Sequence, residues 1–332
     1  AQVLIQWVPL IRSGYRYQPI IDLGDEGLRR IGRLAFPVLL ASAVGQLGLV
    51  VDRMLASGLV EGSISALNYA NKLFALPIGI FVAAVTTVLY PTLSAHAARK
   101  DAAALLNVFR RGFGIITLIV MPMMIGLIVL AHPVVRVVYE RGAFDADATR
   151  LTSFALVFFS VGMLGAAAAE LLARVFFALQ DTTTPMIIGA ASVGLNILLN
   201  FALIGPLAHG GLALSLSITA TFNAGALLLA LRRKLGPIGG RAMGITLLKA
   251  ALASAVMGVA VVAAYSFASR WLTGLGMLRE ALRVGAVIGL GAIIYLATLL
   301  PLRVPELREA IGLTVKAAEA VRGRLFPVER KS

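Results

Sequence analysis

Residues 66–90 read ALNYANKLFALPIGIFVAAVTTVLY, an apolar run that is long enough to cross a bilayer as a helix. Lys72 lies inside this run, and Ser65 and Asn68 precede it at helical spacing, so the three side chains share one face. A charge at this depth costs about 3 kcal/mol unless it meets water, an opposite charge or a polar ligand. The stretch therefore predicts a membrane helix beside a polar pathway. The alternative is a lysine that reaches the interface without binding anything.

Seven further apolar runs predict an all-α, polytopic membrane protein with eight transmembrane helices. The predicted spans cover residues 34–51, 66–90, 113–131, 151–178, 185–206, 210–231, 246–268 and 281–301. Composition agrees, because 59% of the residues are hydrophobic and the mean hydropathy is +0.90. Soluble domains are only about 45–50% apolar. The lack of cysteine excludes disulfides and thiolate metal sites.

The net charge of +14 is distributed as membrane topology requires. If the first residues are cytoplasmic, about three Lys or Arg fall on inner segments for each one on outer segments. This bias places both ends of the chain in the cytoplasm. It indicates anionic membrane lipids as neighbours, and it argues against nucleic acid as a partner.

The stretch LRRKLGPIGGR (231–241) is the strongest internal boundary, because it combines a proline, three glycines and four cations. The first residues, AQVLIQWVPLI, resemble the tail of an apolar segment, so we expect the chain to be part of a longer protein. The predicted parts are the end of a preceding helix with a cytoplasmic interfacial linker (1–33), a six-helix lobe (34–231), a cytoplasmic loop (232–245), two additional helices (246–301) and a basic cytoplasmic tail (302–332).

Other polar residues at or inside the spans are candidates for function. Asp52, Asn196 and Asn200 carry oxygens that suit hard cations, with an interfacial ion pair as the alternative for Asp52. Taken alone, the two asparagines are better explained by helix–helix amide hydrogen bonds. Glu170 and Arg174 are spaced i, i+4 and predict an ion pair, either structural or acting as a gate latch.

Sequence motifs for catalysis are absent. There is no HExxH, no carboxylate pair near the three histidines, and no GxxxxGK[ST]. The acids are dispersed, whereas a membrane-embedded transferase needs them clustered at one surface. We therefore predict a transporter and no enzyme.

Five motifs then resemble the MurJ/MviN family of lipid II flippases, in order along the chain. They are VDRMLASGLVEGSISALNYANKLFALPIGIFVAAVTTVLYPTLSAHAA (51–98), YERGAFDADAT (139–149), RVFFALQDTTTP (174–185), LNILLNFALIGPLAHGGLALSLS (195–217) and LRRKLG (231–236). The RGAF and QDTTTP signatures together are specific, and the resemblance covers about residues 12–236, with weaker similarity beyond.

This resemblance implies a fold and an activity. Members belong to the multidrug/oligosaccharidyl-lipid/polysaccharide (MOP) exporter superfamily, with two six-helix lobes around a central cavity and two extra helices. The match places this chain at the second lobe and the extra helices, so its partner is a missing N-terminal lobe. The implied activity is the flipping of lipid II, the undecaprenyl-pyrophosphate-linked peptidoglycan precursor, across the bacterial cytoplasmic (inner) membrane by alternating access.

The resemblance also implies roles for residues. Lys72 matches a cavity cation that is usually Arg in the family, and Ser65 matches a serine that faces the cavity, so Lys72, Ser65 and Asn68 are the implied substrate-binding set. The last two spans match a pair that forms a groove for the polyprenyl tail; their glycines include Gly258, Gly285 and Gly289.

Some members bind a sodium ion in the second lobe, and no other cofactor or metal is implied. Asp52, Asn196 and Asn200 fall on positions that resemble its ligands, with Ser217 as a hydroxyl ligand if the alignment shifts by one residue.

Three other functions stay open from the sequence. One is a MOP-superfamily exporter of a different polyprenyl-linked oligosaccharide or of a cationic drug. Another is a membrane-embedded transferase that acts on the same lipid. The third is a scaffold domain without transport activity.

Overall fold

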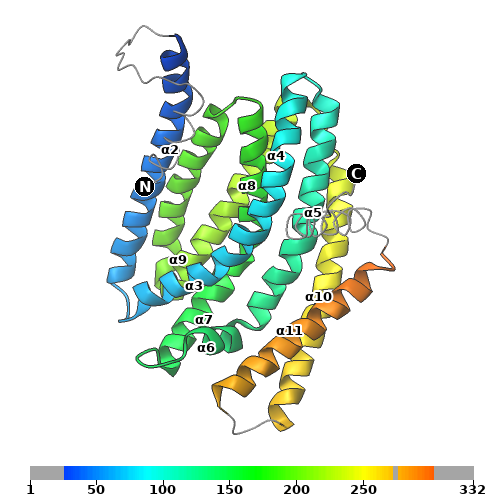
Figure 1. Cartoon of the computed structure of the whole chain (residues 1–332). Helices are drawn as coiled ribbons and strands as arrows, with labels where there is room; N and C mark the ends of the chain where they lie inside the picture. The colour runs from blue at the N-terminus through cyan, green and yellow to red at the C-terminus, as the bar shows by residue number, and fades with distance from the viewer. Residues whose placement is uncertain (1–25, 272–275, 303–332) are drawn as a thin grey trace, which may run out of the picture.

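The computed structural model describes residues 26–271 and 276–302, and every regular element in these ranges is helical (Figure 1). The elements are α2 (Glu26–Ser57), α3 (Ser63–Pro77), the π-helical η1 (Ile78–Val82), α4 (Ala83–Ala98), α5 (Ala102–Val129), α6 (Ala131–Tyr139), α7 (Ala146–Val161), α8 (Met163–Ala178), α9 (Thr183–Leu235), α10 (Gly240–Trp271) and α11 (Met277–Leu299). The all-α prediction is thus confirmed. The predicted linker 1–33 and tail 302–332 lie outside the described residues, apart from residues 26–33 and 302.

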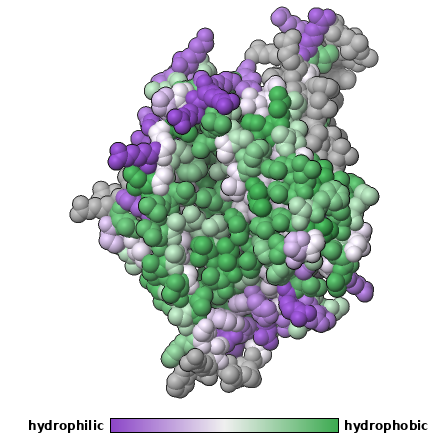
Figure 2. Space-filling view, turned by 180° about the vertical axis from the view of Figure 1, so that it is seen from behind, coloured by the Kyte–Doolittle hydropathy of each residue, from purple (hydrophilic) through white to green (hydrophobic). Residues whose placement is uncertain are grey.

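Five described helical segments are long and apolar enough to cross a membrane, and a sixth is added if α7 and α8, bent by 48°, form one span. This confirms a multi-pass membrane protein. The predicted count of eight stays a prediction, because α2 is not among these segments and α9 counts once although it contains two predicted spans. Figure 2 shows the corresponding surface, a broad apolar band between hydrophilic ends.

The 53-residue α9 is two arms joined at a sharp bend, not one straight helix. Ala208 has non-helical dihedrals (φ 48°, ψ −130°), and the chain folds back there so closely that a Cβ on Gly211 would lie 2.2 Å from the Leu203 carbonyl oxygen. Only glycine fits at that contact. The bend places both arms against neighbouring helices, with α2 and α8 packed on α9 (Figure 1).

Prolines interrupt two of the spans in different ways. Pro77 has no N–H to donate to the preceding turn, and the helix continues through it as the π-helical η1. Pro122 likewise leaves the carbonyl of Leu118 without a helical donor. The hydroxyl of Tyr295 on α11 donates to that carbonyl at 2.8 Å, so a distant helix satisfies the group that the proline leaves free.

Two hydrophobic clusters hold the described helices together. The larger joins α3 to α9 around fully buried side chains such as Phe109, Phe176 and Leu171. The smaller joins α5 to α10 and α11 around Met257, Val287 and other side chains. Of the last two helices, α10 attaches to the rest through α5, as Figure 1 also shows, and α11 contacts α6 as well as α5.

Candidate functional site

The helix α3 presents a polar face. Its apolar side chains, such as Leu73 and Phe74, are buried in the large cluster, whereas Ser65, Asn68 and Lys72 are exposed. The sequence pattern explains this division, because residues three and four apart share a face of a helix. The ammonium of Lys72 lies 5.3 Å from the centre of the Tyr69 ring, at cation–π distance. No carboxylate within the described ranges forms an ion pair with Lys72, so its charge is free to meet an anion.

A cavity of about 270 Å³ opens beside this face, between α2, α3, α7 and the second arm of α9. Asn68 and Asn71 line it from α3, and Asp52 and Arg53 line it from α2. Lys72 is not among its lining residues, and Ser65 lines a different cavity at the beginning of α3. The three predicted substrate residues thus share an exposed helix face but not one pocket.

Three of the four predicted cation ligands meet behind this cavity. The Nδ2 of Asn200 donates to Oδ1 of Asp52 at 2.6 Å and to Oδ1 of Asn196 at 3.3 Å. Both asparagines are buried, and Oδ1 of Asn200 has no hydrogen-bond partner. Ser217 lies elsewhere, because its hydroxyl donates to the carbonyls of Phe158 and Phe159 at 2.5 and 3.0 Å in the α7–α9 contact.

These residues supply oxygens of the kind that a hard cation prefers, although here Asn200 turns its Nδ2, not its Oδ1, toward Asp52 and Asn196. One carboxylate and neutral amide oxygens are the ligands that such ions prefer, and an unpartnered buried Oδ1 is an acceptor that a cation satisfies. Histidine and acid clusters of the kind that hold transition metals are absent from the part of the chain that the structure describes.

Sequence reasoning missed Asn223, whose buried Oδ1 also lacks a partner. It lines a second cavity of about 330 Å³ together with Asp52 and Asn196. The signal was present, since an asparagine inside an apolar span is costly. It was overlooked because its neighbours in space come from another helix.

The ion pair predicted for Glu170 and Arg174 is not formed between these two described residues, although both lie on α8. Instead, Lys234 at the end of α9 pairs with Asp181 before its start, at 2.6 Å. Burial opposes ionisation of Asp181, but hydrogen bonds from Lys234 and Thr184 outweigh it and lower the pKa of that carboxyl below its ordinary value.

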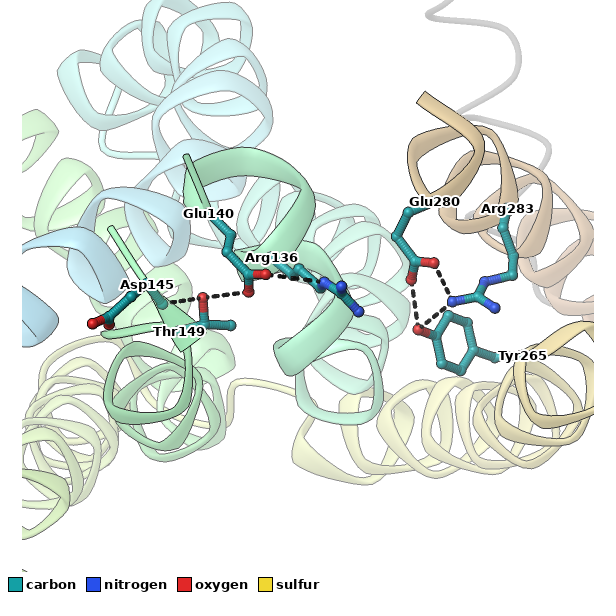
Figure 3. A network of polar contacts seen from close by, with 7 residues as sticks. All are labelled: Arg136, Glu140, Asp145, Thr149, Tyr265, Glu280 and Arg283. Carbon is teal, nitrogen blue, oxygen red and sulfur yellow. Dashed lines mark hydrogen bonds and ion pairs between the residues drawn. The ribbon is translucent and has the colours of Figure 1, made fainter. Parts of the chain in front are cut away.

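A polar network lies where α6 and α7 approach α10 and α11 (Figure 3). The hydroxyl of Tyr265 donates to Glu280 at 2.7 Å, and Arg283 bonds to both. Across from it, Arg136 pairs with Glu140 at 3.2 Å, and Glu140 accepts from Thr149 at 2.8 Å (Figure 3). Each of these side chains has a partner within its own group, so the two groups have structural roles at the ends of their own helices.

A third, almost wholly apolar cavity of about 670 Å³ lies between η1, α5, α6 and the α10–α11 pair. Phe81, Met123, Val261 and Tyr295 are among its lining residues. Gly291 lines it, whereas of the predicted groove glycines Gly258 packs against Ile125 on α5, and Gly285 and Gly289 face open space.

Comparisons with known proteins identify the family. The family model described as lipid II flippase MurJ matches residues 1–281. Proteins named probable lipid II flippase MurJ from Vibrio cholerae and Haemophilus influenzae are each 32% identical to this chain, over 93% and 91% of it. The chain spans 59% and 60% of the length of these relatives.

Solved structures give the same assignment. A lipid II flippase MurJ in an inward closed conformation superposes with a TM-score of 0.64 at 26% identity, covering 89% of this chain and 58% of that one. A MOP superfamily transporter from Pyrococcus furiosus, 16% identical with a TM-score of 0.53 over 81% of this chain and 63% of that one, shares the fold. This chain therefore belongs to the MurJ family of lipid II flippases.

Proposed function

We propose that the protein to which this chain belongs flips lipid II from the inner to the outer leaflet of the bacterial cytoplasmic membrane. This chain would supply the second lobe and the two extra helices, and the region that completes the relatives' length would supply the first lobe. The family match carries the proposal. The uncovered polar face of α3 supports it, because a face with an unpaired lysine needs a polar partner.

Lys72 would contribute to capture of the pyrophosphate. A lysine and a phosphate about 4 Å apart attract by roughly 4 kcal/mol at the effective dielectric of a protein surface. The Tyr69 ring holds the ammonium on the α3 face, while Asn68 and Asn71 offer amides to the head group in the adjoining cavity. Lysine acts as a point charge, so the anion can be passed on as the two lobes rock between inward-open and outward-open states.

The polyprenyl tail would occupy the apolar cavity beside α10 and α11. Because lipid tails are as apolar as this lining, the cavity gains little affinity from hydrophobicity and serves to position the tail. A polar head group is excluded from it, since its buried groups would lack hydrogen-bond partners. Head and tail are thereby sorted to different sides of the lobe.

A sodium ion would be held by oxygens of Asp52, Asn196 and Asn200, without Ser217, because Ser217 lines neither of the two cavities that Asp52 lines. When bound, the ion would supply positive charge that offsets Asp52. The chain's own contribution is to hold α2 against the first arm of α9 through the Asn200–Asp52 hydrogen bond, so that the distance between these helices depends on the charge of the site.

The proposed orientation follows the charge bias. Both ends of the chain lie in the cytoplasm, where Lys and Arg meet anionic lipids. The protein acts on lipid II without covalent chemistry and needs no nucleic acid.

The test is complementation of a strain depleted of its lipid II flippase by the full-length parent protein. Growth is expected with the wild type and with Lys72→Arg, and a strong loss is expected with Lys72→Ala at equal expression. Growth with Lys72→Ala as good as wild type would show that Lys72 does not contact substrate. Failure of the wild type would favour an exporter of another lipid-linked oligosaccharide, and product formation from lipid-linked precursor in vitro would favour a transferase.

A further inference from the structure

Asp52 lies between two cavities with different electrostatic character. On the α3 side, the cavity also contains Arg53, and Lys72 lies near it on the exposed face. On the other side, the 330 Å³ cavity between α2 and the two arms of α9 is lined by no cationic residue that the structure describes. We call this second space the α2–α9 chamber. A cation that approaches Asp52 through the chamber avoids the positive charges that it meets on the α3 side.

The chamber is polar where the surrounding helices are apolar. Ser192, Asn196, Thr219 and Asn223 line it together with Asp52. Three glycines leave the space open: a Cβ on Gly45 or Gly189 would meet nothing within 4 Å, and one on Gly48 would contact Val193 at 3.2 Å. At about 30 Å³ for each water molecule in the liquid, several waters fit.

Buried polar atoms in and beside the chamber lack partners. They are Nδ2 of Asn196, Oδ1 of Asn223 and, beside Asp52, Oδ1 of Asn200. An unsatisfied buried polar atom costs about 1–3 kcal/mol, so these groups favour a polar occupant over an empty space. The hydroxyls of Ser192 and Thr219 already donate to carbonyls of their own helix at 2.8 and 2.7 Å, which leaves their oxygens free as further acceptors.

The charge of the site selects the ion. Among the described residues, Asp52 is the one carboxylate that lines either cavity. A monovalent cation neutralises it, whereas a divalent cation would leave an uncompensated positive charge beside Arg53 in a weakly polar region. Oxygen-only ligands favour a hard ion, so a hard monovalent cation such as Na⁺ is the chemical class that fits best.

We propose that the α2–α9 chamber is the route by which Na⁺ reaches Asp52, and that Asn223 is a further cation-binding residue within it. This rests on the proposed cation role of Asp52 in the flippase. Asn223 comes from the second arm of α9 and Asn196 and Asn200 from the first, so a cation that moves along the chamber meets amide oxygens of both arms on its way to Asp52. Ion and lipid phosphate would then reach the lobe from opposite sides of Asp52.

The first experiment measures sodium affinity in the purified full-length protein. The unfolding midpoint is followed as NaCl replaces choline chloride at constant ionic strength. We expect Na⁺ to raise the midpoint of the wild type, and Asn223→Leu to need at least tenfold more Na⁺ for half of its effect. Asn71→Leu, the matched change on the α3 side, should keep the wild-type dependence of the unfolding midpoint on Na⁺. Equal midpoints in choline show that both variants fold.

The second experiment tests access. In a background without other cysteines, Ala220→Cys places a thiol on the chamber wall. We expect a small cationic thiosulfonate to modify it and Na⁺ to slow the reaction several-fold. Ala213→Cys, which is fully buried outside the chamber, should stay unmodified. Modification that Na⁺ does not slow, or an unchanged sodium response in Asn223→Leu, would overturn the proposal.

The two proposals fail separately. If the protein flips lipid II but its unfolding midpoint does not change with Na⁺, the sodium route is wrong and the flippase proposal stands. If the sodium response depends on Asn223 but the protein does not flip lipid II in proteoliposomes, the cation site stands and the proposed function is wrong.

Discussion

The α2–α3–α9 side of the molecule and the α5–α10–α11 side are built on opposite principles. On the first, amides, a carboxylate and glycines that face open space surround two partly polar cavities. On the second, apolar side chains surround one cavity, and the glycines Gly258 and Gly291 are in contact with neighbouring helices. The polar side offers hydrogen-bonding groups to a ligand and leaves some of them unsatisfied, whereas the apolar side offers a larger cavity with almost no polar lining.

Matched glycine substitutions give the largest expected difference between the two sides. A Cβ on Gly258 would lie 2.8 Å from Cγ2 of Ile125, whereas one on Gly189 meets nothing within 4 Å. Gly258→Leu should therefore lower the free energy of unfolding by about 1–3 kcal/mol through overpacking. Gly189→Leu should not lower it, because the Cβ meets no neighbour and leucine has a higher helix propensity than glycine. Unfolding of the purified full-length variants measures both, and equal effects would contradict the contrast in packing.

A negative charge added to the polar face of α3 should reduce the rate of lipid II transport about tenfold, equivalent to about 1.4 kcal/mol. Asn68→Glu places a carboxylate one turn before Lys72, in the order that favours an i, i+4 pair, and this pair would neutralise the ammonium. Asn68→Gln keeps the amide and serves as control. Lipid II flipping in proteoliposomes is the measurement, and full activity of Asn68→Glu would show that the free charge of Lys72 is not needed.

On the apolar side, Tyr295→Phe should cost about 1 kcal/mol of stability. It removes the donor that satisfies the Leu118 carbonyl, which Pro122 leaves without a helical partner. In Pro122→Ala, the N–H of residue 122 can donate to the Leu118 carbonyl within the helix, so the loss caused by Tyr295→Phe should be smaller in this background. The two single variants and the double variant together form a double-mutant cycle. Additive effects of the two changes would mean that Tyr295 and Pro122 are not coupled.

The smallest effect concerns the inner end of α9. The pKa of Asp181 is lowered, so its pairing with Lys234 stabilises the fold fully above the ordinary carboxyl pKa of about 3.9 and is lost as pH falls through the lowered value. Because Lys234 is 43% exposed, solvent screening limits the effect of Asp181→Asn to about 0.5 kcal/mol at neutral pH. Unfolding midpoints of wild type and variant should run parallel from pH 8 to pH 5. A difference that grows across that range would contradict this assignment.

Local spacing predicted helices well and pairs of side chains poorly. Glu170 and Arg174 have the spacing of an ion pair, yet no pair forms between them, because i, i+4 neighbours need only share a face and each is free to turn away. The pair that does form, Asp181 with Lys234, joins residues 53 positions apart. Hydropathy located the apolar segments, and the spans predicted at 185–206 and 210–231 correspond to the two arms of α9 that meet at the non-helical Ala208.

The sequence by itself determined that the chain is helical, that it crosses the membrane several times and, through its motifs, that it belongs to the MurJ family. These properties follow from hydropathy, from the spacing of apolar residues and from short motifs, all of which can be read from the order of residues in the chain. Only the tertiary structure decided that Asn200 hydrogen-bonds Asp52, 148 positions away, and that Asn223 lines a cavity together with Asp52. It also decided that the Tyr295 hydroxyl donates to the Leu118 carbonyl that Pro122 leaves without a helical donor. Such contacts depend on the angles at which distant helices pack, and those angles are set by the sum of many side-chain contacts that no short stretch of sequence contains.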